Sequence, residues 1–486
     1  MTRILFDKLR SDLPDLLNGG LEDATNCIPY GNSYGPFPEP VAYSVSATGR
    51  VYGAFSTRDT SGNAYTFVAT QGQLYRESAT ALNNVSRTAS YATATDKVFE
   101  FITFGNTTLG VNGTDALQVY TLGTSTQFLD ASASASAPIA AHIATVRDFV
   151  FLGNLSTGNN RVQWSRINNP LRYTPSQQYQ ADFQDLPGDN AAIQRITGGD
   201  FATILTKSSV WRASYVGSPL IFRFDELAPG IGCMAGGSCA RFQGSTYFLS
   251  PPGFFVFDGN QAQPIGDEEI DAYFLADLNK SFLSRITAVI DPDNKLYIVS
   301  YPSVSSTDGL CDKLAIFSWA ANRWTFVSQN LEWLFINLAG GVTLEGLDAY
   351  GTMETLQYSL DSDVWQGGTA FLGGVDEGHR ITRFTGADKT ARFITGESQI
   401  IPDGRAFLRA IRPLVQGNSA TSVSVQIGYR DRLIDDVQWT TASTMNATGV
   451  CPVRNNARFQ RLRMDISSGF ERAMGADVDY TGEGFR

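Results

Sequence analysis

Short runs of alternating hydrophobic and polar residues fill the chain between residues 41 and 378, and most end at a cluster of Gly, Asn, Asp, Ser or Pro. This pattern predicts short β-strands joined by tight turns. The strands pair as hairpins, and a large aromatic residue stands near the end of each second strand. These aromatics recur about every 45 residues, with a longer last interval. They are Tyr75, Tyr120, Trp164, Trp211, Phe257, Tyr297 and Tyr358.

A hairpin period of this length predicts an all-β fold with the four-stranded blades of a β-propeller. One blade alone leaves its edges and an apolar face open, and neighbouring blades around an axis cover them. Residues 286–301 and 313–328 predict the two hairpins of one complete blade. We expect six to eight blades, with seven favoured. A pair of β-sandwich domains is the competing fold, but it would not repeat the hairpin at a fixed period.

The pattern changes after Gly378, where longer alternating runs over 405–417, 421–432 and 456–467 replace the hairpin period. These runs predict a separate β-sandwich-like module over 379–486, following a propeller over 41–378. Residues 1–40 are rich in Pro, Gly and Asn, which predicts an extended anchoring segment. Its spaced apolar residues are expected to pack on the C-terminal module or on a neighbouring subunit. The candidate interface residues there are Leu13, Leu16, Leu21, Ile28, Tyr34 and Phe37.

The net charge of −11 argues against a protein that wraps nucleic acid, because such a protein needs a basic surface. The charge is uneven along the chain. Residues 379–486 carry 15 Lys+Arg against 11 Asp+Glu, which leaves 22 against 37 for the rest. Nearly all of these C-terminal basic residues are Arg, which favours protein interfaces. We therefore take Arg458, Arg461 and Arg463 as interface candidates, with a solvated basic face as the alternative.

The five cysteines are odd in number and form no C-x-x-C motif, which predicts free thiols in a protein made in a reducing cytoplasm. Only Cys233 and Cys239 are close enough in sequence for a local bridge. The N-terminus shows no secretory signal pattern, and no apolar run approaches the length of a membrane span. We expect synthesis in a cytosol and no membrane insertion.

Motifs for catalysis are missing from the sequence. The two histidines, His142 and His379, lie far apart and form no metal-binding spacing, and no nucleophile elbow or nucleotide-binding loop occurs. We therefore predict no catalytic residues, no cofactor and no metal. Paired carboxylates of a glycosidase are the enzymatic alternative. The densest acidic run, Asp267, Glu268, Glu269 and Asp271, is a candidate channel lining, with a solvated loop or short helix as the alternative.

The stretch DLPDLLNGGLEDATNCIPYGNSYGPFP at residues 12–38 resembles the N-terminal pattern of the tail nozzle, or hub, proteins of short-tailed bacteriophages. Residues 162–176, 217–233, 253–274 and 446–466 are similar to that group as well. The residues that match the N-terminal pattern are Pro14, Asp15, Asn18, Gly20, Leu21, Ala24, Asn26, Pro29, Tyr34, Pro36, Phe37 and Pro38.

The resemblance implies a structural, non-enzymatic subunit of the virion tail, assembled in the host cytoplasm. It implies six copies in a ring below an adaptor ring, extending the channel through which DNA leaves. It further implies contacts with tail fibres or tailspikes and with the plug or needle that closes the channel. An acidic wall suits such a conduit, because it repels DNA in transit without specific binding. The alternative is a propeller that binds or hydrolyses glycans of the host surface.

Overall fold

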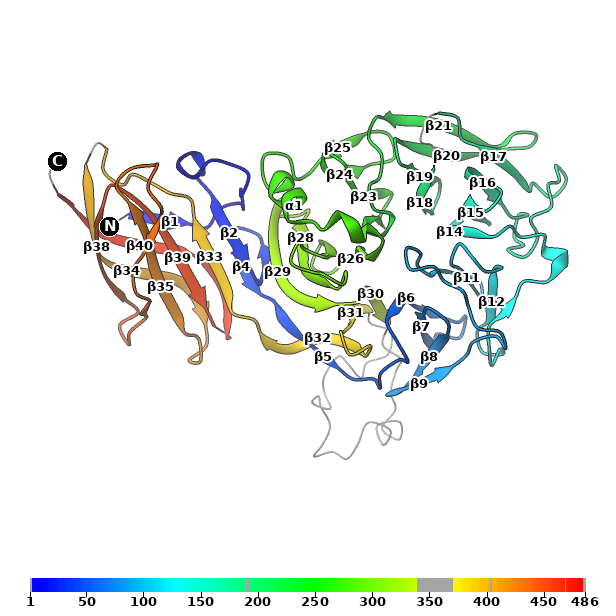
Figure 1. Cartoon of the computed structure of the whole chain (residues 1–486), viewed down its shortest axis with the longest axis horizontal. Coiled ribbons are helices and arrows are strands. Elements are labelled where there is room, and N and C mark those ends of the chain that lie inside the picture. The colour runs from blue at the N-terminus through cyan, green and yellow to red at the C-terminus, as the bar shows by residue number, and fades with distance from the viewer. Residues whose placement is uncertain (1, 189–191, 339–369, 403, 468, 484–486) are drawn as a thin grey trace.

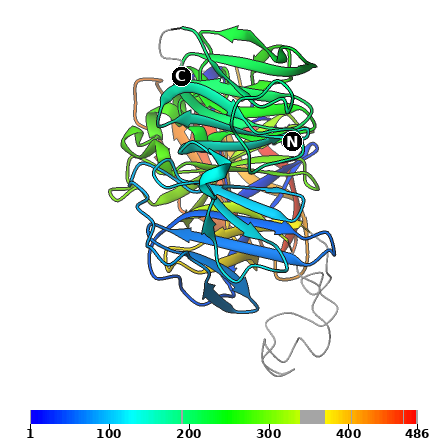
Figure 2. The ribbon, with the colours of Figure 1, turned by 90° about the vertical axis from the view of Figure 1, so that its right-hand side faces the viewer.

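The structure, a computed structural model, describes residues 2–188, 192–338, 370–402, 404–467 and 469–483. It has two lobes side by side, a β-propeller and a β-sandwich, and both chain ends lie at the sandwich (Figure 1). Seen from the propeller end, the sandwich strands lie behind the blades (Figure 2). The predicted hairpin at 347–360, which includes Tyr358, falls outside the described residues. Among the described residues, no helix is long and apolar enough to cross a membrane.

Seven antiparallel blades of four strands form the propeller in the described part of the chain, within the predicted range of six to eight. The first three blades are β6 (Val51–Arg58), β7 (Ala64–Thr70), β8 (Leu74–Ser78), β9 (Ala81–Asn84); β10 (Glu100–Phe104), β11 (Thr107–Val111), β12 (Gln118–Thr121), β13 (Leu129–Asp130); and β14 (Ala140–Val146), β15 (Phe149–Leu155), β16 (Gly158–Trp164), β17 (Asp182–Asp185). The next three are β18 (Ile193–Thr197), β19 (Ala202–Thr206), β20 (Ser209–Gly217), β21 (Ile221–Pro229); β22 (Ala240–Phe242), β23 (Ser245–Ser250), β24 (Gly253–Phe257), β25 (Ala262–Pro264); and β26 (Thr287–Asp291), β27 (Leu296–Tyr301), β28 (Cys311–Ser318), β29 (Arg323–Leu331).

The seventh blade joins two distant parts of the chain. It consists of β30 (Trp333–Leu338), β31 (Ala370–Val375), β32 (Ile381–Asp388) and, from the N-terminal region, β5 (Pro38–Ala42). Two prolines are tolerated in β5 because it is the outermost strand of the blade, where one side needs no ladder hydrogen bonds. The propeller therefore spans 38–388, whereas the sequence placed its boundaries at 41 and 378. The difference arises because β32 continues the hairpin pairing beyond Gly378 and takes β5 as its partner.

The recurrent aromatics mark the third strand in five blades. Tyr75, Tyr120, Trp164, Trp211 and Phe257 lie on β8, β12, β16, β20 and β24, and all are buried. Tyr297 lies instead on β27, the second strand of the sixth blade, which explains the shorter interval before it. The spacing of the aromatics therefore equals the length of one blade, because a bulky side chain at the same strand position fills the space between neighbouring sheets.

The sandwich consists of two sheets, and both contain strands from the N-terminal segment. The first sheet has the order β3 (Cys27–Tyr30), β4 (Ser33–Pro36), β40 (Phe470–Glu483), β34 (Arg405–Gly417), β38 (Cys451–Ala457), with β1 (Thr2–Leu5) also on β40. The second has the order β2 (Leu21–Thr25), β33 (Ala391–Thr395), β39 (Phe459–Ile466), β35 (Val423–Arg430), β36 (Gln438–Trp439), with β37 (Ser443–Thr444) also on β35. The helical turns are η1 (Asp15–Leu17), η2 (Ala133–Ala135), η3 (Gly236–Ser238), α1 (Asp271–Asp277) and η4 (Lys280–Arg285).

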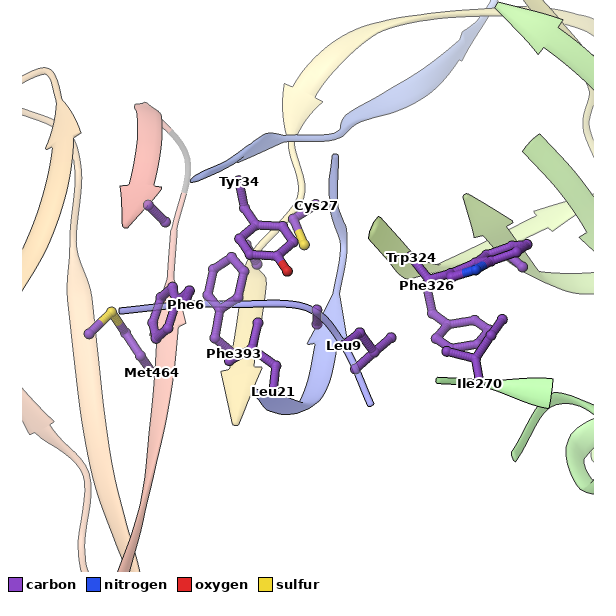
Figure 3. Packing of buried hydrophobic residues seen from close by; sticks show 14 of the residues in the cluster. Phe6, Leu9, Leu21, Cys27, Tyr34, Ile270, Trp324, Phe326, Phe393 and Met464 are labelled. Atoms are coloured by element: carbon purple, nitrogen blue, oxygen red, sulfur yellow. The ribbon is translucent and has the colours of Figure 1, made fainter. Parts of the chain in front are cut away.

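One hydrophobic cluster runs through both lobes. Inside the sandwich, Phe6 stacks on Phe393 with ring centroids 4.7 Å apart, and Met464 lies beside them (Figure 3). On the propeller side, the same cluster includes Phe326 and Trp324 of the sixth blade. Strand β2 also pairs in parallel with β29, so the second sheet of the sandwich continues into that blade. The shared core and the shared sheet make the two lobes one packed body.

Candidate functional site

The N-terminal segment is the most distinctive feature of the sequence, and it lies at the junction of the two lobes. Asn18 organises its first turn. Its amide nitrogen donates to the carbonyls of Arg10 at 2.9 Å and Leu21 at 3.2 Å, and its amide oxygen accepts from the Gly20 N–H at 2.9 Å. A Cβ at Gly20 would lie 2.2 Å from the carbonyl oxygen of Lys8, so only glycine permits this close passage.

Asn26 connects the sandwich to the sixth blade. It adopts a left-handed backbone conformation with φ of 60° between β2 and β3, which asparagine tolerates better than most residues. Its backbone N–H donates to the Phe326 carbonyl at 2.7 Å, and its side-chain oxygen accepts from the Ser328 N–H at 3.0 Å. Its amide nitrogen donates to the Thr390 carbonyl at 3.1 Å. One residue of the pattern therefore holds three segments together.

Tyr34 and Phe37 are enclosed by the chain itself. The Tyr34 ring packs on Phe393, and its hydroxyl donates to the Asp7 carbonyl at 2.5 Å. Burial raises the pKa of Tyr34, so the phenol stays a neutral donor. Phe37 packs edge-on against Phe384 of β32, with the ring centroids 5.4 Å apart. These two residues, together with the buried Leu21, are intrachain anchors and are not exposed to a second copy. Of the other apolar candidates, Leu13 and Ile28 are half-buried and Leu16 is 43% exposed.

Arg461 lies under the N-terminal segment at the centre of a charge network. Its guanidinium contacts the carboxylates of Asp15 at 2.5 Å and Glu397 at 3.6 Å, and it also pairs with Glu22. Arg430 binds Glu397 through two nitrogens, at 2.6 and 2.9 Å, and reaches Asp15 at 3.1 Å. Burial raises the pKa of Glu22, and Arg461 opposes that rise. Arg461 is 6% exposed, so the centre of this network is buried, whereas Asp15 and Glu22 at its rim are partly exposed.

The other two predicted interface arginines differ from Arg461. Arg463 lies on the same strand and pairs with Asp465 at 3.0 Å at the surface. Arg458 is exposed, and its guanidinium lies over the Phe459 ring at 5.3 Å. The sequence suggested these three residues because Arg favours protein interfaces and they are close together in the C-terminal part of the chain, but the N-terminal segment covers only Arg461. Arg458 is exposed on the sandwich, and Arg463 is half-buried in its ion pair with Asp465.

The predicted acidic run leads into α1 beside the N-terminal segment. Asp267 and Glu268 are exposed, whereas Glu269 pairs with Lys8 at 2.8 Å. Asp271 is buried, and its carboxylate accepts from the Phe254 N–H at 3.0 Å. Burial, reinforced by neighbouring carboxylates, raises the pKa of Asp271 to about 6. The run is therefore part loop and part structural anchor, and only its first two residues present free negative charge.

The inner strands of the propeller enclose an axial cavity of about 310 Å³, with an adjoining cavity of about 390 Å³. Glu100, the first residue of β10, lines both. Its carboxylate accepts from His142 Nδ1 at 2.8 Å and from the Ile143 N–H at 3.3 Å, and it pairs with Arg195. Burial alone would raise the pKa of Glu100, but Arg195 and His142 outweigh it and lower the pKa.

The second histidine takes part in a similar arrangement two blade boundaries away, between the seventh and first blades. Glu332, just before β30, accepts from His379 Nδ1 at 2.9 Å and from the Val51 N–H of the first blade at 3.0 Å. Glu100 and Glu332 each join the inner strand of one blade to that of the next. Both were missed at the sequence level, although a lone Glu at the start of an apolar run was a usable signal. Among the described residues, no cluster of His, Cys, Asp and Glu could hold a metal ion.

A group of exposed arginines lies on the outer side of the first sandwich sheet. The side chains of this sheet alternate between the core and solvent, and its outward positions include three Arg on the neighbouring strands β34 and β38. We call these residues the arginine face: Arg409, Arg412 and Arg454. The interface arginines expected from the sequence lie elsewhere, on or next to β39, because strand order cannot be deduced from the alternation alone.

Solved structures that are similar to this chain share little of its sequence and superpose on it only in part. No protein-family profile and no curated protein matches the chain. The WD40 domain of Neurospora crassa Pan2 is 9% identical, covering 69% of this chain and 91% of that domain with a TM-score of 0.38. The designed protein Ika8 is 11% identical, covering 71% and 99% with a TM-score of 0.37. BBS1N, solved with ARL6DN, is 6% identical, covering 71% and 97% with a TM-score of 0.40.

Proposed function

We propose that this chain is a structural subunit of the tail nozzle of a short-tailed phage, and that six copies form a ring around the DNA-exit channel. The observation that carries the proposal is the position of the nozzle-like pattern. Asn18 and Gly20 shape the first turn of the N-terminal segment, and the Tyr34 ring packs inside the sandwich. Asn26 binds the sixth blade and Phe37 packs on the seventh, so these two residues join the lobes. A sequence that resembles the nozzle pattern at these positions shares the constraints of this two-lobed architecture.

A rigid two-lobed body suits a subunit that must hold a channel open. The lobes share one core and one sheet, so the angle between them is fixed by packing rather than by a linker. Such a body can place its sandwich against a neighbour while its propeller forms the wall of a ring. Oligomers of this kind close when the same two surfaces meet around a symmetry axis.

Charge complementarity favours a second copy of the chain as the partner of the arginine face. Residues 38–388, which form the propeller, contain 21 Lys+Arg and 33 Asp+Glu. Residues 1–37 and 389–486, which supply the sandwich, together contain 16 Lys+Arg and 15 Asp+Glu. An exposed arginine face on a neutral lobe complements an acidic lobe on the next copy, and such patterns specify partner and register. Asp267 and Glu268 stay candidates for the wall that faces DNA.

Reconstitution with the other tail components tests this proposal. Phage particles that lack the nozzle but retain the adaptor ring are mixed with purified chain, and bound protein is measured after sedimentation. We expect six chains per particle and recovery of infectivity when fibre or tailspike protein is also supplied. A chain that never binds the adaptor ring, at any concentration that saturates other tail proteins, would contradict the proposal.

A glycan-binding propeller is the second candidate, and the polar adjoining cavity of about 390 Å³ is the observation that favours it. Hydrolysis needs a carboxylic acid with a raised pKa, whereas the pKa of Glu100 is lowered by its ion pair. Glu100 therefore does not supply that acid, and we take this candidate as a binding site. Binding on a glycan array, abolished by Lys207→Ala at the cavity wall, would favour it over the nozzle.

A further inference from the structure

Two of the five buried cysteines lie in contact. The Sγ atoms of Cys233 and Cys239 are 3.5 Å apart, at either side of the short turn η3. Neither residue belongs to a strand, since Cys233 lies in the connection after β21 and Cys239 directly precedes β22. A disulfide requires an S–S distance of about 2.05 Å, so a shift of about 1.5 Å would join the two sulfurs. Side-chain rotation with a small movement of the irregular segment can supply it.

The surrounding protein holds this segment in place without a covalent bond. Ser238 accepts a hydrogen bond from the Tyr297 hydroxyl at its carbonyl, 2.6 Å away, and its own hydroxyl accepts from the Leu249 N–H at 2.9 Å. A Cβ at Gly236 would lie 2.1 Å from the Gln194 carbonyl oxygen. The turn is thus held by packing and hydrogen bonds to neighbouring blades, and these contacts keep the two thiols close together.

The pair also has a route to small molecules. Cys239 lines the axial cavity of about 310 Å³, where Arg195 and Glu100 are its polar neighbours. Cys233 lies behind it and donates its S–H to the Ala235 carbonyl at 3.2 Å. A small oxidant that enters the axis of the propeller therefore meets Cys239 first, and Cys233 is positioned to resolve the product.

We propose that Cys233 and Cys239 form an oxidation site, at which a peroxide converts the two thiols into an intramolecular disulfide. The Cys239 sulfur attacks one peroxide oxygen, and the O–O bond breaks. Water leaves, and Cys239 is converted into a sulfenic acid. The Cys233 sulfur then attacks the Cys239 sulfur, the S–O bond breaks, and a second water leaves. One peroxide is reduced by two electrons, and each thiol loses one hydrogen.

Burial makes this reaction slow and the dithiol durable during synthesis. Desolvation raises the pKa of Cys239 well above that of an exposed thiol, which keeps the nucleophilic thiolate scarce. In a reducing cytoplasm the pair stays a dithiol, and after release from the cell the bridge accumulates. The closed loop pins η3 at the axis. This timing depends on the proposed virion location, whereas the oxidation site itself does not.

The test uses the purified full chain, incubated natively with hydrogen peroxide or with dithiothreitol. Free thiols are counted by alkylation after denaturation, and a peptide map locates any bridge. We expect the peroxide-treated wild type to lose two thiols and two hydrogen atoms of mass, with one bridge between Cys233 and Cys239. The Cys311→Ser variant serves as the matched control, because Cys311 is equally buried, and it should form the same bridge.

Single variants separate a specific bridge from general oxidation. Cys233→Ser should stop at the sulfenic acid of Cys239, which a dimedone probe labels, and Cys239→Ser should leave Cys233 unmodified. Retention of all five alkylatable thiols in treated wild type would overturn the proposal. A bridge between any other pair would overturn it as well. Failure of ring assembly with the bridge formed would refute the nozzle proposal alone.

Discussion

Replacing Arg461 tests whether the N-terminal segment is held to the sandwich by buried charge. The Arg461→Met variant keeps the length of the aliphatic stem but removes the guanidinium. Glu397, whose side chain is fully enclosed, and Asp15 then depend on a single arginine, and Glu22 loses its ion pair. Arg463→Met is the matched control, because Arg463 lies two residues along the same strand and pairs only with a surface Asp.

The burial of Arg461 determines how much stability the Arg461→Met variant should lose. Removing one partner of a buried ion pair costs about 3–5 kcal/mol. Here Arg430 still binds Glu397, and Glu22 is 36% exposed and regains some hydration. We therefore expect a loss at the lower end, about 3 kcal/mol. The control removes a surface pair, which is worth at most about 1 kcal/mol.

Native-state hydrogen exchange measures this difference locally, without assuming that both lobes unfold together. Amides of β33 and β39 should exchange about a hundredfold faster in the Arg461 variant, and within about fivefold of wild type in the control. Without Arg461 the pKa of Glu22 rises further above its unfolded value. Stability linked to Glu22 is then gained as pH falls through that raised pKa, so the defect shrinks at acidic pH. Equal exchange in both variants at neutral pH would refute the network.

Three further predictions concern other parts of the chain. Gly20→Ala should lower the melting temperature by several degrees, because its Cβ would collide with a carbonyl, whereas Gly19→Ala, with nothing within 4 Å, should be neutral in calorimetry. Asp271→Asn should flatten the pH dependence of stability. In wild type the pKa of Asp271 in the folded state, about 6, exceeds its unfolded value, so stability rises as pH falls through 6. Urea unfolding measured over a series of pH values checks this, and the same pH dependence in wild type and variant would contradict it. Charge reversal of the arginine face should leave the circular dichroism spectrum intact and abolish assembly in light scattering; assembly that survives would remove these residues from the interface: Arg409, Arg412 and Arg454.

The propeller could be predicted from the sequence because its signal is local. Each hairpin carries its own alternation and turn, and a large aromatic such as Tyr120 or Trp164 repeats at one strand position. The closure of the ring could not be predicted, because β5 and β32 pair across more than three hundred residues. Pro38 and Pro40 were informative only in retrospect, since they mark an outermost strand once the pairing is known.

The roles of the charged residues depended on long-range packing. Arg461 and Arg463 are two residues apart on one strand and have similar sequence surroundings. Only the path of the N-terminal segment distinguishes them. Asp271 stood in an acidic run that suggested solvent exposure, but its carboxylate anchors the backbone of β24. The partners of Glu100 lie 42 and 95 residues away, so its interior role is set by the order of the blades.

Imaging of the purified chain bound to its adaptor ring tests the central claim most directly. Negative-stain microscopy should show a six-membered ring below the adaptor, coaxial with the channel, with each subunit divided into two lobes. Light scattering of the ring alone should give six times the chain mass of 52.9 kDa. A monomer that persists at all concentrations, and that is absent from the tail axis in images of virions, would contradict the account.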